Sequence, residues 1–296
     1  GLFLIRDRFG VRPFYYGWLD DNIVVCGSET CAFDESTKKI KEVKPGEVIY
    51  IGDNETIAKQ VNVNRKYIHK YYQLPEKHVN PSFCIFEHLY FMNHTSIVND
   101  NSIYTYRYKL GIALAKKNTD KIFNKDNTIV VGSPKSGISA GEGYAMQTGL
   151  PYKQVINKNE NVGRTFILPT DEERMNACEK AFIIDDDVCD KNIIIVDDTI
   201  VRGNTFKALI VKLREKKPKS VHVKIAAPKI INPCNLGIDL PTKEELITNK
   251  CNDMPEYLNA DSIQFLTLDE VNNVIGSNNC SKICGCFEDG QKYNDW

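Results

Sequence analysis

The chain has 296 residues, of which 42% are hydrophobic and 26% are charged, and its formal net charge is -1 at pH 7. A near-neutral chain lacks the basic surface that attracts nucleic acids and anionic membranes. No apolar run approaches the roughly 20 residues that cross a bilayer. We therefore expect one large or two modest globular domains with small-molecule substrates, and neither nucleic acid nor membrane as a partner.

The beginning of the chain, GLFLIRDRFG, has neither an initiator methionine nor a secretion signal, because charges interrupt its only apolar run. It is typical of the middle of a domain, so we expect a fragment that lacks an N-terminal segment. Ten cysteines are too few for a small disulfide scaffold of this length. A reducing, cytoplasmic compartment is therefore expected.

Residues 1 to about 65 are predicted to form β structure. Their short runs are rich in β-branched and aromatic residues, and glycines and Asp-Asn clusters separate them as hairpin turns do. Four strands without a helix would leave one apolar face uncovered. Residues 66–82 are polar, contain two prolines and are predicted to be a connector. The predicted strands are GLFLIRD (1–7), RPFYYGWL (12–19), NIVVCGSE (22–29) and GEVIYIGD (46–53).

From residue 103 onward, predicted helices and strands alternate, which indicates an α/β fold with a parallel sheet covered by helices. Gly149 is expected to end the second helix. Apolar residues at helical spacing predict helices at 103–117, 138–149 and 206–217. Short apolar runs predict strands at 127–132, 151–157, 191–198 and 220–228.

Two adjacent acids, Asp197 and Asp198, end the apolar run NIIIVDD. Neighbouring carboxylates repel each other and need a positive partner, and the ligands of an open parallel sheet lie beyond the carboxyl ends of its strands. Mg²⁺ is usually held by one or two carboxylates together with ligand oxygens. The pair therefore predicts a magnesium-dependent ligand site; the alternative is a turn that only caps a helix.

The loop after the acids predicts a phosphate site. Gly203 lets the backbone approach a ligand closely, Arg202 adds positive charge, and the N–H groups at the start of the next helix favour an anion. In GSPKSG, Ser136 and Gly137 join another strand to another helix and predict a second anion site. Further side-chain donors in the first loop are Thr199, Asn204 and Thr205.

The stretch IIIVDDTIVRGNT resembles the motif with which type I phosphoribosyltransferases bind 5-phosphoribosyl-1-pyrophosphate (PRPP). More widely, the chain resembles the amidophosphoribosyltransferase family through RDRFGVRPFYYG, SETCAFD, KPGEVIYI, CIFEHLYF, VGRTFI, PCNLGIDLPTKEELI and ADSIQFLTL. The resemblance implies a type I phosphoribosyltransferase domain at 71–275. It also implies the β-rich tail of an N-terminal-nucleophile glutaminase domain at 1–70, and a cysteine-containing tail at 276–296.

The resemblance implies an enzyme that forms 5-phosphoribosylamine and pyrophosphate from PRPP and glutamine-derived ammonia, the first step of de novo purine synthesis. It also implies a homo-oligomer that purine nucleotides inhibit. Position by position, Asp197 and Asp198 match catalytic acids that face the ribose and Mg²⁺, and Ser136 matches a magnesium-associated serine. Lys158 and Arg164 match a catalytic loop that closes over pyrophosphate. The 5-phosphate loop corresponds to Thr199 through Thr205, with Arg202, Gly203 and Asn204.

The family's glutaminase uses a first-position cysteine as its nucleophile, whereas this chain starts with Gly1. Cys26 and Cys31 lie in or beside predicted strands and are expected to be structural thiols. We predict that the 296-residue chain makes phosphoribosylamine from ammonia but not from glutamine. Glutamine-dependent formation of phosphoribosylamine by the purified chain would contradict this prediction.

Four residues depart from the family pattern: Lys135 stands in place of an acid, Glu160 and Asn161 in place of Arg and Tyr, and Cys178 in place of a basic residue. Each lost charged hydrogen bond to pyrophosphate costs roughly 1.5–3 kcal/mol. One alternative is therefore a catalytically weakened relative that binds PRPP or a nucleotide as a regulator or partner subunit. Another is a phosphoribosyltransferase for nucleobase salvage.

Many members of the family carry a [4Fe–4S] cluster, which thiolates bind. Cys84, Cys234, Cys284 and Cys286 match its ligands. The chain has C-x-C in CGCF where the family has C-x-x-C, so Cys280 is an alternative ligand. The competing interpretation is a set of buried thiols without a cluster.

Overall fold

The computed structural model describes residues 1–19, 23–52, 68–117, 123–159, 181–240, 242–288 and 290. The chain divides into two compact units, Gly1–Ile103 with Ser277–Ile283 and Tyr104–Gly276 with Cys284–Trp296. The domain limits predicted at residues 70 and 275 stay predictions. Among the described residues, every helix is too short or too polar to cross a membrane.

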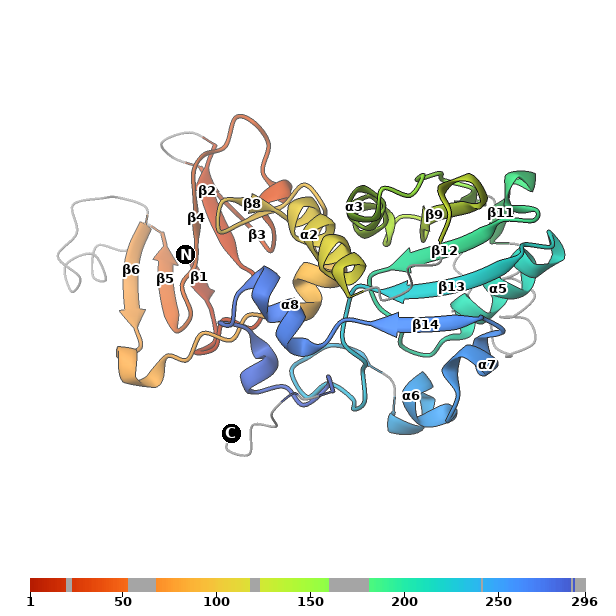
Figure 1. The fold of residues 1–296 in the computed structure, drawn as a ribbon. Helices are drawn as coiled ribbons and strands as arrows, with labels where there is room; N and C mark the ends of the chain where they lie inside the picture. Colours follow the sequence, from red (N-terminus) through yellow and green to blue (C-terminus); the bar gives the residue numbers. More distant parts are fainter. Residues whose placement is uncertain are drawn as a thin grey trace. The chain divides into compact units, whose positions relative to one another are not determined.

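The described part of the first unit contains two three-stranded antiparallel sheets, with strand orders β1-β5-β6 and β3-β2-β4, and the two-stranded antiparallel pair β7-β8 (Figure 1). The four predicted strands are confirmed as β1 (Leu2–Ile5), β2 (Tyr15–Trp18), β3 (Val24–Gly27) and β5 (Glu47–Ile51). The predicted connector is wrong over β6 (Ile68–Gln73), which pairs with β5 across an irregularity in register. Smaller elements of this unit are β4 (Lys38–Glu42), β7 (Ile97–Val98), β8 (Asn101–Ser102) and the helical turns η1 (Thr30–Ala32), η2 (Glu76–His78), η3 (Glu87–Phe91) and η8 (Cys280–Lys282).

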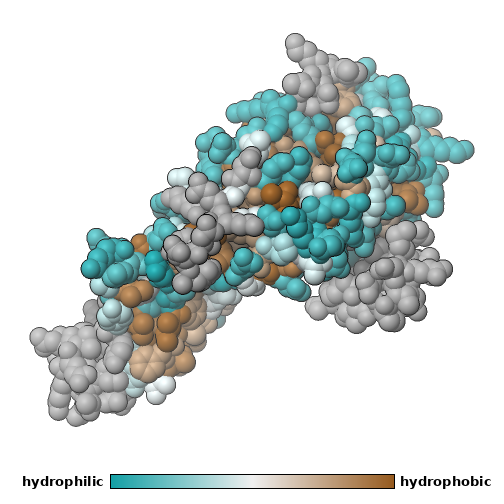
Figure 2. Space-filling view, turned by 90° about the horizontal axis from the view of Figure 1, so that it is seen from below, coloured by the Kyte–Doolittle hydropathy of each residue, from teal (hydrophilic) through white to brown (hydrophobic). Residues whose placement is uncertain are grey.

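One face of β1 packs on a core and the other is open. Leu4 belongs to a buried cluster with Tyr16, Val43 and Ile49. Because side chains alternate along a strand, Phe3 and Ile5 point to the opposite face, where they are 46% and 65% exposed. Figure 2 shows a face of the molecule on which hydrophobic residues gather, and Leu2, Phe3 and Ile5 of β1 are all exposed. The uncovered apolar face expected from the sequence is therefore present.

The second unit is built on a parallel sheet with the strand order β14-β13-β12-β9 (Figure 1). This confirms the predicted α/β fold. The main elements are α2 (Ile103–Lys116), β9 (Thr128–Gly132), α3 (Ile138–Thr148), β12 (Asn192–Asp197), α5 (Asn204–Glu215), β13 (Ser220–Ile225) and β14 (Ser262–Phe265). Smaller elements are η4 (Lys125–Asn127), β10 (Ile156–Lys158), β11 (Phe182–Ile184), η6 (Asp186–Val188), η7 (Lys243–Glu245), α6 (Ile247–Lys250), α7 (Met254–Leu258) and α8 (Leu268–Ile275).

Two sequence predictions in this unit need correction. The strand predicted at 151–157 forms only in part: Tyr152 makes an isolated parallel bridge to Val130 of β9, and the last predicted residues enter β10, which pairs antiparallel with β11 outside the parallel sheet. Helix α5 begins at Asn204, two residues before the predicted start, because Gly203 turns the chain with a left-handed φ of 79°. Gly149 ends α3 as predicted, with φ 68°.

The sheet is buried on both faces at the strand that leads to the acids. Ile193, Ile194, Ile195 and Val196 are all 0% exposed, as expected where helices cover both sides of a parallel sheet. Helix α3 packs on β9 and β12. Central β12 therefore provides a rigid support for the residues at its carboxyl end.

Candidate functional site

The two acids lie at the carboxyl end of β12, and both are buried, with 7% of Asp197 and 5% of Asp198 exposed. Ser136 donates its Oγ–H to Asp197 Oδ1 at 2.7 Å. The backbone N–H of Asp198 donates to the same oxygen at 2.8 Å, and Thr199 Oγ1 donates to Asp198 Oδ1 at 2.8 Å. The structure therefore brings Ser136 to the acids, as the sequence predicted.

The loop that carries Ser136 is held against the end of β12 by its backbone. Ser133 donates its N–H to the Val196 carbonyl at 2.8 Å, and Gly137 donates to the Ser133 carbonyl at 3.0 Å. A Cβ on Gly137 would overlap the Val196 carbonyl oxygen. Lys135, one of the family departures, is exposed and left-handed, with φ 73°. That conformation costs a non-glycine residue of the order of 1–3 kcal/mol, and such strain is typical of functional loops.

Burial dominates the electrostatics of the acid pair. It raises the pKa of Asp197 to about 6, although hydrogen bonds from Ser136, the Asp198 N–H and Ser133 oppose the shift. Burial, followed by the charge of Asp197, raises the pKa of Asp198 well above its usual range. The hydrogen bond from Thr199 and the positive charge of Arg107 lower the pKa of Asp198 only in part.

Arg107 is a residue of the site that the sequence prediction missed. It lies on α2 and is 8% exposed. Its guanidinium supplies part of the positive charge that two neighbouring carboxylates require. A single arginine within YTYRYK carries no local pattern that would connect it with acids 90 residues later; only the packing of α2 reveals the relation.

One carboxylate oxygen of the pair, Asp198 Oδ2, is buried without a hydrogen-bond partner among the described residues. Leaving such an oxygen unpaired costs free energy, so a ligand hydroxyl or a cation would stabilise it. Together with Asp197 and the hydroxyl of Ser136, it forms a set of hard oxygen donors. This set fits Mg²⁺, which takes oxygen ligands from one or two carboxylates and from its substrate.

The predicted phosphate loop leads from the acids into α5. Gly203 is the N-cap residue, and no side chain caps this helix end or that of α3. Asn204 and Thr205 occupy the first turn of α5, where backbone N–H groups favour an anion. Arg202 is half-exposed and lies 3.7 Å from Glu245.

Of the two residues predicted for the closing loop, Lys158 and Arg164, the structure describes Lys158 alone. Lys158 is the exposed last residue of β10, in the two-stranded sheet with β11. Arg164 lies outside the described residues, as do three of the family departures, Glu160, Asn161 and Cys178.

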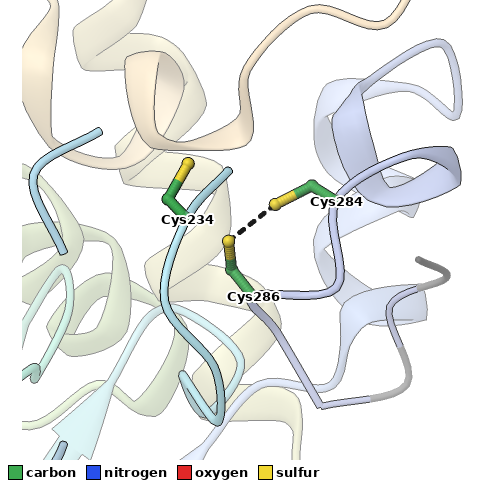
Figure 3. Close-up of side chains that lie close together, drawn as sticks. All are labelled: Cys234, Cys284 and Cys286. Carbon is green, nitrogen blue, oxygen red and sulfur yellow. Dashed lines mark hydrogen bonds between the residues drawn. The ribbon is translucent and has the colours of Figure 1, made fainter. Parts of the chain in front are cut away.

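A group of cysteines forms a second candidate site within the second unit. The Sγ atoms of Cys234, Cys284 and Cys286 all lie within 4.8 Å of one another. Figure 3 shows the three side chains close together. In the first unit the thiol of Cys280 hydrogen-bonds that of Cys84 and lowers the Cys84 pKa. Three of the predicted cluster ligands therefore come together, and this thiol group could hold a metal.

The chain was compared with known proteins, and no family model matches it. It is 35% identical over 291 residues to the chloroplastic amidophosphoribosyltransferase of Glycine max, a match that covers 97% of this chain and 48% of the relative. The solved glutamine PRPP amidotransferase of Bacillus subtilis, complexed with ADP and GMP, matches with a TM-score of 0.78 and 32% identity. That match covers 99% of this chain and 62% of the other.

Over nearly its whole length, this chain is similar to amidophosphoribosyltransferases. A second solved structure, an allosteric regulatory enzyme of purine biosynthesis, matches with a TM-score of 0.79 and 32% identity, covering 99% of this chain and 61% of that one. The type I phosphoribosyltransferase fold predicted from the sequence is thereby confirmed. The chain spans about half the length of the curated amidophosphoribosyltransferases that it matches.

Proposed function

We propose that the second unit binds PRPP with Mg²⁺ and catalyses the displacement of its pyrophosphate by ammonia to form 5-phosphoribosylamine, opening purine biosynthesis. In a longer protein the ammonia would come from glutamine. The observation that carries the proposal is the buried acid pair at the end of a central parallel strand, with the unpartnered Oδ2 of Asp198. The similarity of nearly the whole chain to amidophosphoribosyltransferases supports it.

Each part of PRPP has a matching group in the chain. The 5-phosphate would accept hydrogen bonds from the backbone and side chains of the loop from Thr199 to Thr205, at the N-terminus of α5. The ribose hydroxyls would donate to the carboxylates of Asp197 and Asp198, which would satisfy the unpartnered oxygen. Mg²⁺ fits the oxygens of these acids and of Ser136 and, when bound, offsets the negative charge of pyrophosphate.

The reaction breaks the bond from ribose C1 to the pyrophosphate oxygen and forms a bond from C1 to the nitrogen lone pair of ammonia. The new ammonium group then loses a proton, and pyrophosphate leaves with the bonding electrons. The ribose gains positive charge as the bond breaks, so the carboxylates of Asp197 and Asp198 stabilise it electrostatically. Lys158 and Arg164 would bind the leaving pyrophosphate and exclude water.

Purine nucleotides are the proposed inhibitors, because they share the ribose 5-phosphate of PRPP. The Bacillus subtilis relative was solved with ADP and GMP bound, which supports this proposal. We also propose a homo-oligomer in the cytoplasm, whose reducing conditions suit a chain in which the described cysteines form no disulfide.

The test is to incubate the purified chain with PRPP, Mg²⁺ and ammonium, and to measure pyrophosphate and phosphoribosylamine. Release of pyrophosphate should require all three, should be lost in Asp198→Asn and should persist in Asp187→Asn, an exposed acid on η6. Binding heat without turnover would support the weakened, regulatory relative instead. Stimulation by a nucleobase in place of ammonium would support a salvage enzyme. Neither heat nor turnover with the wild-type chain would refute the proposal.

A further inference from the structure

The three clustered cysteines are positioned by two segments that backbone bonds hold together. Ile231 donates its N–H to the Cys286 carbonyl at 2.7 Å, and Glu288 donates to the Lys229 carbonyl at 2.9 Å. Asn232 Nδ2 donates to the Gly285 carbonyl at 2.8 Å. Cys234 therefore lies opposite the turn that carries Cys284 and Cys286 (Figure 3). The hydrogen bonds of Ile231, Glu288 and Asn232 involve no sulfur atom.

The sulfur positions do not fit the [4Fe–4S] cluster that the resemblance implies. Each thiolate ligand of such a cluster binds a different iron, so its sulfurs are spread around a four-iron body. Here all three Sγ atoms lie within 4.8 Å of one another, and those of Cys284 and Cys286 are 2.8 Å apart. The one-residue spacing of the C-x-C turn keeps these two sulfurs close, where the family has two intervening residues.

The same positions suit ligands of one tetrahedral ion. With Zn–S bonds of about 2.3 Å, the thiolates around a zinc ion lie about 3.8 Å apart. The Cys284–Cys286 pair, 2.8 Å apart, must open by about 1 Å, a shift that side-chain rotation can supply. No pair of the three sulfurs is more than 4.8 Å apart. Soft thiolate donors also select zinc over the hard cations.

We propose that Cys234, Cys284 and Cys286 bind a single zinc ion, with the fourth tetrahedral position left to water or another ligand. Two surrounding features support a thiolate site. Leu236 donates its backbone N–H to Cys234 Sγ at 3.2 Å, the kind of outer-shell bond that orients metal ligands. Cys284 and Cys286 are 6% and 2% exposed, so a cation would compensate the cost of burying thiolate charge.

The first experiment uses the wild-type chain, purified anaerobically, with measurement of zinc, iron and acid-labile sulfide. We expect about one zinc per chain and neither iron nor sulfide at cluster stoichiometry. After removal of the metal with a chelator, titration with Co²⁺ alone should give thiolate-to-metal charge-transfer bands and the strong visible bands of tetrahedral cobalt. These bands should reach saturation at one equivalent.

The second experiment compares single cysteine variants. Cys234→Ser, Cys284→Ser and Cys286→Ser should each weaken zinc binding by more than about 100-fold, since even outer-shell changes cost about 10–100-fold. Cys189→Ser is the control, because Cys189 is exposed in the same unit and its loss should leave the zinc affinity unchanged. Circular dichroism separates loss of ligand from loss of fold.

Several results would overturn the proposal. About four irons and four sulfides per chain would show that the cysteines bind a [4Fe–4S] cluster and not zinc. A Cys284–Cys286 disulfide in the purified chain would remove two of the three zinc ligands. A flat Co²⁺ titration of the reduced wild-type chain, or unchanged affinity in Cys234→Ser, would refute the site itself. None of these outcomes bears on the acid pair, so the phosphoribosyltransferase proposal stands or fails separately.

Discussion

Replacing Asp197 with asparagine is expected to stabilise the substrate-free protein at neutral pH and to remove most of its pyrophosphate-releasing activity. Burial raises the pKa of Asp197 from 3.8 to about 6, so ionising this carboxyl group at pH 7 costs free energy in the folded state. Asparagine has nearly the same shape, and its carbonyl oxygen can still accept from Ser136 and from the Asp198 N–H. The free energy of unfolding should rise by about 1–3 kcal/mol at pH 7.

The pH dependence follows from the direction of the shift. Between about pH 4 and 6, the folded protein keeps a proton on Asp197 that the unfolded chain has lost, so the free energy of unfolding falls as pH rises. Below that window both states are protonated and the penalty is absent; above it the penalty is fully present. In Asp197→Asn, the free energy of unfolding should not show this decrease between about pH 4 and 6. The free energies of unfolding of the variant and the wild-type protein should therefore differ most at neutral pH.

Urea unfolding across this pH range measures the stability effect, and pyrophosphate release from PRPP measures activity. Activity should fall by about 10- to 10²-fold, because a charge-assisted interaction with the ribose or Mg²⁺ is worth roughly 1.5–3 kcal/mol. Asp187→Asn is the matched control. A hydrogen bond from Lys153 lowers the pKa of Asp187 in the folded protein, so this substitution should lower the free energy of unfolding at neutral pH instead of raising it. A variant Asp197→Asn that is less stable at pH 7, or fully active, would contradict this account.

Local sequence patterns predicted the parts of the site that lie on regular elements. The apolar run into Asp197 predicted β12, and the two strand-to-helix loops predicted that Ser136 and the acids would share one edge of a parallel sheet. Parallel pairing makes this inference possible, because the carboxyl ends of neighbouring strands meet at the same edge.

The parts that the sequence did not predict depend on contacts between distant segments. Strand β14 has only four half-buried residues, so it has no apolar run that distinguishes it from a loop. Arg107 is buried through the packing of α2, where Gly111 and Gly143 allow close contact with α3. The cysteines show the same limit: Cys234 meets Cys284 across 50 residues, and the pairing of Cys84 with Cys280 follows from folding of the first unit.

Replacing Gly137 with alanine is expected to disrupt the acid site. Its Cβ would overlap the Val196 carbonyl oxygen, lie 2.7 Å from the Ser133 N and lie 3.0 Å from Asp197 Cα. All three are backbone atoms, so no flexible side chain can move to relieve the overlap. The loop must instead separate from β12, which breaks the Ser133–Val196 hydrogen bond. Overpacking of this kind costs about 1–3 kcal/mol or more.

The matched control is Gly149→Ala at the other end of the same helix. Gly149 has φ 68°, and the nearest atom to its added Cβ is the flexible Lys125 Nζ at 3.2 Å, so the cost should be limited to about 1–2 kcal/mol of left-handed strain. Urea unfolding would show both losses, but calorimetry with PRPP and Mg²⁺ should show binding lost only in Gly137→Ala. Because Ser136 reaches Asp197 only while this loop lies on the strand end, normal binding by a folded Gly137→Ala variant would mean that PRPP binds elsewhere.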